Sequence, residues 1–222
     1  MEFIYECDNV FPVDFCNRVI EKFEKSNLKM NGRMAGGEIR TVKKSTDVRI
    51  YDEPEWVEEE KYFQVMIRKA MKKYETFIFK MDVDDKVKKY MSGDLMNTHI
   101  HPPQIQRTEP GQYYHWHHDQ TFGHEAPCWK IFSYIIYLND VEKDSGGTTE
   151  FSCGKTIQPK VGKIVFFPCT WTYFHRGKTL EKGVKYIATN GLMIKPIRQF
   201  ALSRREIEQI NKPVLPFVIS RD

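Results

Sequence analysis

Apolar side chains at helical spacing predict two helices in the first third of the chain. Across residues 11–26 they recur every three or four positions, and Pro12 and Asp14 stand where a helix usually begins. Residues 54–79 show the same spacing over a longer stretch, at Trp56, Phe63, Ile67, Ala70, Tyr74 and Ile78. We expect both helices to pack through these apolar faces as a supporting layer.

From residue 104 onward the pattern changes to short apolar runs separated by turn residues such as Glu109-Pro110-Gly111 and Asn139-Asp140. Residues 38–51 are expected to hold one or two further strands. Short strands after a helical start predict a mainly β fold, a cupin-like jelly roll whose N-terminal helices pack on one sheet. The predicted strands cover residues 104–107, 113–117, 130–138, 148–151, 155–158, 163–167, 171–175 and 185–193.

The length of 222 residues suits one domain, and we interpret residues 1–222 as such. Helical support is expected over about 11–81, the jelly-roll core over about 104–195, and a C-terminal tail over 196–222. Residues 82–103 have the composition of an ordinary loop and also that of a flap over the site.

Composition argues against a nucleic-acid-binding, a membrane-spanning or a disulfide-rich protein. The net charge of +4 is scattered in short, interrupted clusters, which favours solvated surface over a nucleic-acid groove. No apolar run approaches the ~18 residues that a membrane helix needs, and the N-terminus lacks the basic start of a signal peptide, so we expect a cytoplasmic protein. The five cysteines form an odd set without a close pair and are interpreted as reduced thiols.

The segment that ends in His117-His118-Asp119 is the richest in potential metal ligands. Side chains alternate along a strand, so His117 and Asp119 would project to one side and His118 to the other. A third ligand is available in His175, at the end of a later predicted strand. Two imidazoles and one carboxylate on one face of an ion leave positions open, an arrangement associated with non-haem iron(II) oxygenases.

The sequence allows two alternatives for this site. His115, His117 and Asp119 form a competing ligand set, but three positions two apart on one strand span ~13 Å, which is too far to close around one ion. A zinc hydrolase can use a similar ligand set. Lys185 favours the oxygenase, because a lysine in an apolar barrel needs an anion, and the distal carboxylate of 2-oxoglutarate is one.

Several motifs together resemble the 2-oxoglutarate/iron(II) oxygenases of the prolyl 4-hydroxylase type, over most of the chain. They are Asn9-Val10-Phe11-Pro12, Pro110-Gly111-Gln112-Tyr113-Tyr114, Tyr137-Leu138-Asn139-Asp140, Gly146-Gly147-Thr148-Thr149-Glu150-Phe151, the run from Pro159 to Phe167, and His175 with Gly183-Val184-Lys185-Tyr186.

This resemblance implies a double-stranded β-helix, Fe(II) as the metal, 2-oxoglutarate and O₂ as co-substrates, and ascorbate as a further requirement. It identifies His117, Asp119 and His175 as iron ligands and Lys185 as the anchor for the C5 carboxylate of 2-oxoglutarate. Four further residues are implied at the co-substrate or in the active-site lining: Ser133, near the same carboxylate, Thr108, Tyr137 and Tyr114.

The sequence departs from the family pattern at two positions. Thr108 stands where the family commonly has a tyrosine that contacts 2-oxoglutarate. Gly191 replaces a tryptophan of the last strand, which would leave more open space near the pocket.

The resemblance implies hydroxylation of a substrate C–H bond, most plausibly at a prolyl residue of a peptide or protein, with release of succinate and CO₂. The alternatives are hydroxylation of a free amino acid or small metabolite, and a catalytically silent jelly-roll binding module. No nucleic-acid or membrane partner is expected.

Overall fold

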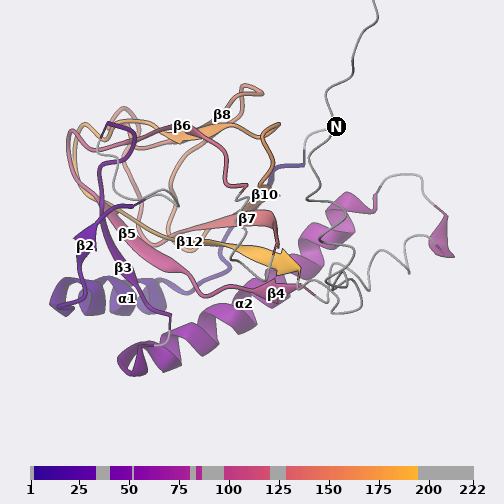
Figure 1. The fold of residues 1–222 in the computed structure, drawn as a ribbon, viewed down its shortest axis with the longest axis horizontal. Helices are drawn as coiled ribbons and strands as arrows, with labels where there is room; N and C mark the ends of the chain where they lie inside the picture. The colour runs from indigo at the N-terminus through magenta and orange to yellow at the C-terminus, as the bar shows by residue number, and fades with distance from the viewer. Residues whose placement is uncertain are drawn as a thin grey trace, which may run out of the picture.

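The computed structural model describes residues 3–33, 41–51, 53–80, 84–86, 98–120 and 129–194. They form two antiparallel sheets and two long helices (Figure 1). The elements in chain order are β1 (Tyr5–Cys7), α1 (Val13–Lys25), β2 (Met30–Asn31), β3 (Thr46–Arg49), the short 3₁₀ helix η1 (Pro54–Trp56), α2 (Val57–Ile78), β4 (His99–Ile100), β5 (Gln104–Thr108), β6 (Tyr114–His117), β7 (Trp129–Tyr137), β8 (Thr149–Phe151), β9 (Thr156–Ile157), β10 (Ile164–Pro168), β11 (His175–Gly177) and β12 (Lys185–Ile194).

The two predicted helices are confirmed within three residues of their expected ends. Pro12 sits in extended backbone immediately before α1, where its missing N–H leaves no helical hydrogen bond unmade. Three glutamates occupy the first turn of α2, where the positive end of the helix dipole stabilises negative charge. In both helices the apolar face is buried against the larger sheet, through Phe15, Val19, Phe23, Phe63, Ile67 and Tyr74 among others.

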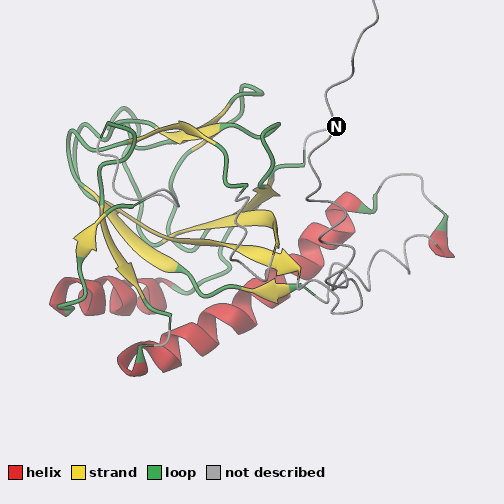
Figure 2. Cartoon of the chain, in the orientation of Figure 1, coloured by secondary structure: helices red, strands yellow, loops and turns green. Residues whose placement is uncertain are grey.

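The larger sheet has the strand order β1-β10-β7-β12-β5-β3-β2, and β4 pairs with β12 at one side. The smaller sheet has the order β6-β11-β8-β9. Both helices lie on one side of the larger sheet and the smaller sheet lies on the other (Figures 1 and 2). This layering is the predicted jelly roll with helices on one sheet.

Alternation along β7 divides the core into two parts. Tyr134 and Ile136 belong to the cluster under the helices, whereas Ile135 and Tyr137 belong to a second cluster between the sheets. The central strand β12 alternates in the same way, since Ala188 packs toward the helices. Each central strand therefore serves both the core and the interior of the barrel, where the candidate site lies.

The predicted strands from residue 104 to 193 are confirmed except one. Residues 171–174 do not form a strand: they make a turn in which the backbone N–H of Tyr173 donates to Thr170, and β11 begins only at His175. Trp171 and Phe174 explain the error, because these aromatic residues resemble a strand in sequence but are largely exposed.

Three short strands, β1, β2 and β4, were not predicted, and each pairs at a margin of the larger sheet. Of the stretch 38–51, residues 46–49 form β3. The proposed tail and most of the 82–103 segment lie outside the described residues. Cys7, Cys16, Cys153 and Cys169 are free thiols, as expected. Neither α1 nor α2 contains a stretch that is apolar enough to span a bilayer.

Candidate metal and co-substrate site

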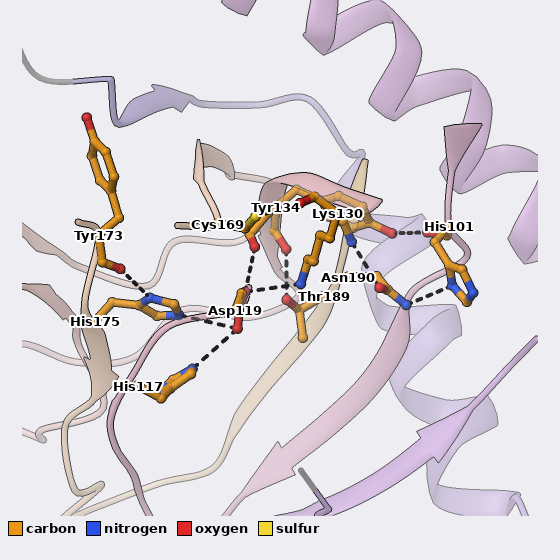
Figure 3. A network of polar contacts seen from close by, with 12 residues as sticks. His101, His117, Asp119, Lys130, Tyr134, Cys169, Tyr173, His175, Thr189 and Asn190 are labelled. Carbon is orange, nitrogen blue, oxygen red and sulfur yellow. Dashed lines mark hydrogen bonds and ion pairs between the residues drawn. The ribbon is translucent and has the colours of Figure 1, made fainter. Parts of the chain in front are cut away.

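Three side chains from two neighbouring strands converge inside the barrel. His117 is the last residue of β6 and lies directly opposite His175, the first residue of β11. Asp119 follows two residues after β6, and its Oδ1 atom lies 3.6 Å from Nε2 of His117 and 4.0 Å from Nε2 of His175 (Figure 3). The three potential ligand atoms lie within 4.8 Å of one another.

Backbone carbonyls orient both imidazole rings. Nδ1 of His117 lies 2.7 Å from the carbonyl oxygen of His115, and Nδ1 of His175 lies 3.1 Å from that of Tyr173. A carbonyl only accepts, so each Nδ1 carries the proton and donates it, which leaves the lone pair of each Nε2 free. Both lone pairs face Asp119, as a metal site requires.

Burial keeps both histidines neutral. It lowers the pKa of His117 to about 3, and the neighbouring His175 adds to the effect. The pKa of His175 is also lowered, chiefly by burial. Neutral imidazole is the form that binds metal, so both rings are ready to act as ligands at physiological pH.

The carboxylate of Asp119 is held at its second oxygen. Oδ2 accepts a hydrogen bond of 2.5 Å from Oγ of Ser133 and lies 3.2 Å from the ammonium of Lys130. Burial alone would raise the pKa of Asp119, but Lys130 and the two histidines outweigh burial and hold the pKa below its ordinary value. Asp119 is therefore ionised and presents Oδ1 to the histidines.

These distances fit a divalent ion. Donor atoms bound at ~2.1 Å and at right angles to one another lie ~3 Å apart, so small side-chain rotations would bring the three atoms onto one metal. Two imidazoles and a carboxylate on one face suit iron(II) with open positions for further ligands. His115 does not belong to the cluster: its side chain is exposed, which removes the competing ligand set.

Lys185 is a further charged group in the interior. Its side chain is buried, and Nζ donates to the carbonyl oxygen of Gly147 over 2.8 Å. Among the described residues no carboxylate lies within ion-pair distance of this ammonium. Desolvation consequently lowers the pKa of Lys185 to about 8. A buried cation with a neutral partner is costly unless an anion joins it.

One cavity of about 220 Å³ contains both features. Its lining includes the three potential metal ligands and Lys185, together with Thr108 and Tyr114. Thr108 is the direct cross-strand partner of Lys185. The ring of Tyr114 stacks on His117 at 3.5 Å between centroids, and so covers one face of that ligand.

Ser133 and Tyr137 are placed differently from what the resemblance implied. Ser133 pairs with Gly191 on β12, six residues from Lys185, which is ~20 Å along a strand. It therefore stands at the Asp119 end of the site and not beside the anchor of the C5 carboxylate. Tyr137 lies behind the cavity wall, because its hydroxyl donates over 2.7 Å to Thr149, which lines the cavity.

The expected open space at Gly191 is not present. A Cβ at this position would lie 2.2 Å from Cε of Lys130 and 2.6 Å from the carbonyl oxygen of Phe132. The lysine side chain fills the volume that a larger residue on β12 would need. Sequence reasoning missed Lys130, and no local signal marks it, since it is one of many lysines in the chain.

Comparison with known proteins agrees with this geometry. Residues 103–191, which contain the three potential ligands and Lys185, match the 2OG-Fe(II) oxygenase superfamily. This part of the chain belongs to that superfamily. Among curated proteins, no sequence matches the chain significantly. The superfamily and the His-Asp-His cluster together imply Fe(II) and 2-oxoglutarate as cofactor and co-substrate.

Solved structures of prolyl hydroxylases share the fold. A viral collagen prolyl hydroxylase from Paramecium Bursaria Chlorella virus-1 is 20% identical, with a TM-score of 0.60 over 86% of this chain and 96% of its own. A Trichoplax adhaerens prolyl hydroxylase in complex with a hypoxia inducible factor peptide is 16% identical, with a TM-score of 0.63 over 87% and 83%. A Pseudomonas putida prolyl-4-hydroxylase is 12% identical, with a TM-score of 0.59 over 89% and 95%.

Proposed function

We propose that this oxygenase hydroxylates prolyl residues of a peptide or protein, with His117, Asp119 and His175 as the iron ligands and Lys185 as the anchor of 2-oxoglutarate. The observation that carries the assignment is a buried ammonium that has no acid partner among the described residues and that lies in the same cavity as the three potential ligands. A dicarboxylate can bridge the two features, because one end chelates a metal while the other neutralises Lys185.

Each residue then has a defined task. The two histidines and Asp119 hold iron(II) on one face, and Lys185 grips the distal carboxylate, with the hydroxyl of Thr108 beside it. The bound metal and 2-oxoglutarate supply oxidation of a substrate C–H bond by O₂, with succinate and CO₂ as co-products. Tyr114 covers the ring of His117, so that ligand is shielded and oriented.

Two further hollows support an extended substrate. One of about 310 Å³ shares Lys43, Lys44 and Ser45 with the central cavity. Another, of about 280 Å³, shares Gln104 and Asn190 with it. Two hollows that adjoin the central cavity at different parts of its lining suit an extended peptide better than one compact metabolite. The likeness in fold to prolyl hydroxylases points the same way.

Mass spectrometry of proline-containing peptides tests the proposal. Incubation with the protein, iron(II), ascorbate and 2-oxoglutarate is expected to add one oxygen at proline, with an equal amount of succinate. The matched controls are the same peptides with alanine in place of proline and the variant His175→Ala. Succinate release driven only by a free amino acid or other metabolite would overturn the prolyl assignment, and no succinate with any substrate would indicate a silent binding module.

The pKa of Lys185 predicts how 2-oxoglutarate binding depends on pH. The anion needs the ammonium form, which predominates below the pKa of about 8 and is lost as the pH rises through it. The apparent dissociation constant should therefore increase above pH ~8, by up to about tenfold per pH unit. Anaerobic titration of the Mn²⁺-loaded protein between pH 6.5 and 9.5 measures it.

The control for this pH dependence is Lys185→Arg, whose guanidinium stays charged across the range and should give a flat profile. A rise of the same size in both proteins would mean that another group titrates.

A further inference from the structure

Lys130 reaches the metal ligands through an irregularity in β7. Side chains alternate along a strand, so a residue three positions before Ser133 should face the helices rather than the barrel interior. The register between β7 and β12 shifts here: Phe132 pairs with Leu192, but the next β12 residue, Met193, pairs with Lys130. Ile131 is therefore an extra residue, a β-bulge, and the bulge turns Lys130 to the same side as Ser133.

Glycine at position 191 leaves the space through which Lys130 reaches Asp119. Gly191 lies opposite Ser133, and a Cβ there would overlap Cε and Cγ of Lys130, at 2.2 and 2.7 Å. Lys130 thus lies across the glycine with its side chain only 12% exposed. The bulge at Ile131 and the glycine at position 191 together place the ammonium of Lys130 in the barrel interior.

The ammonium of Lys130 contacts one carboxylate oxygen of Asp119. Nζ of Lys130 lies 3.2 Å from Oδ2 of Asp119, the same oxygen that accepts the hydrogen bond from Ser133, and Oδ1 is left facing the histidines (Figure 3). Cys169 ties the two segments together, since its thiol donates to the carbonyl of Lys130 and its carbonyl accepts the backbone N–H of Asp119.

We propose that Lys130 is a positioning residue of the metal centre, which holds Oδ2 so that Asp119 binds the ion through Oδ1 alone. The inference rests on the proposed ligand set. A carboxylate that is free to rotate can bind an ion through both oxygens and occupy an extra coordination position. With Oδ2 engaged by Lys130 and Ser133, that position stays open for the co-substrates.

Charge alone predicts the opposite result. An ammonium near a divalent ion repels it, so removal of a lysine that acted only through its charge would tighten metal binding. Removal of a positioning residue should weaken binding, because the carboxylate loses its fixed orientation. The sign of the change therefore decides between the two roles.

The experiment is an anaerobic Co²⁺ titration of the full chain, followed by its visible absorption. Lys130→Met, which keeps the length of the side chain, is expected to raise the Co²⁺ dissociation constant by about tenfold or more. It should also change the Co²⁺ absorption bands, which report coordination number, whereas melting of the metal-free protein reports fold alone. Lys130→Arg, which keeps a charged donor, should restore most of the affinity, and exposed Lys182→Met should match the wild type.

Weaker Co²⁺ binding with altered bands in Lys130→Met, and rescue by Lys130→Arg, support the proposal. Unchanged or tighter binding by Lys130→Met overturns it and leaves the ligand set standing. Where Lys130→Met fails to fold, Gly191→Ala replaces it, because the added Cβ displaces the side chain of Lys130. Weaker Co²⁺ binding with altered bands in Gly191→Ala supports the role, and unaltered affinity with unaltered bands overturns it. A wild-type chain that binds no Co²⁺ would instead remove the metal centre itself.

Discussion

Replacement of His175 by alanine is expected to abolish turnover and to weaken divalent-metal binding. In the proposed metal centre this residue supplies one of three ligand atoms, and its Nε2 has no substitute among the described side chains of the cluster. The loss of affinity should exceed the ~10–100-fold that is typical of losing an outer-shell partner. Co²⁺ titration measures binding, and succinate release measures turnover.

Asp119 calls for a different substitution. Alanine at this position would leave the partly buried ammonium of Lys130 with no acceptor on residue 119, and the resulting loss of stability would be confused with loss of function. Asp119→Asn removes the charge but keeps the shape and one oxygen that can accept hydrogen bonds from Lys130 and Ser133. Substantial succinate release by purified His175→Ala or Asp119→Asn would exclude that residue from the ligand set.

Replacement of Lys185 by methionine should raise the 2-oxoglutarate requirement about 100-fold, because loss of one partner of a buried charge pair costs roughly 2–5 kcal/mol. Binding of Co²⁺ in the absence of 2-oxoglutarate should stay at the wild-type level, since Lys185 contacts Gly147 rather than a ligand. Co-substrate titration at saturating metal measures the effect.

The stability of Lys185→Met provides an independent check. The wild-type ammonium is buried, and within the described part of the chain its hydrogen-bond partner is a neutral carbonyl, so an apolar side chain of similar length should stabilise the ligand-free protein. A higher melting temperature together with a weaker response to 2-oxoglutarate is the expected pair of results. An unchanged co-substrate titration would refute the anchor.

The local periodicity of apolar residues was enough to predict most of the helices and strands. The helices were predictable because their apolar faces repeat over four to six turns, and the longer strands because alternation and turn residues mark both ends. The strands β1, β2 and β4 have only two or three residues, too few to show a period. The strand prediction for residues 171–174 was wrong because aromatic residues favour strands, yet here they form an exposed turn.

The candidate site also has one part that the sequence predicts and another that depends on the tertiary structure. By itself the sequence predicted the three potential ligands and the buried cation: two candidate ligands two residues apart share a strand face, and a lysine in a strand that faces inward needs an anion. Their meeting was confirmed because His117 and His175 are direct partners on neighbouring strands.

Only the tertiary structure decided which groups surround those residues. The register of β7 on β12 separated Ser133 from Lys185 and brought it to Asp119. A single extra residue at Ile131 reversed the direction of Lys130, which filled the space over Gly191. A bulge changes the face of every residue beyond it without changing composition or spacing, so no reading of the pattern along the chain could locate this ammonium.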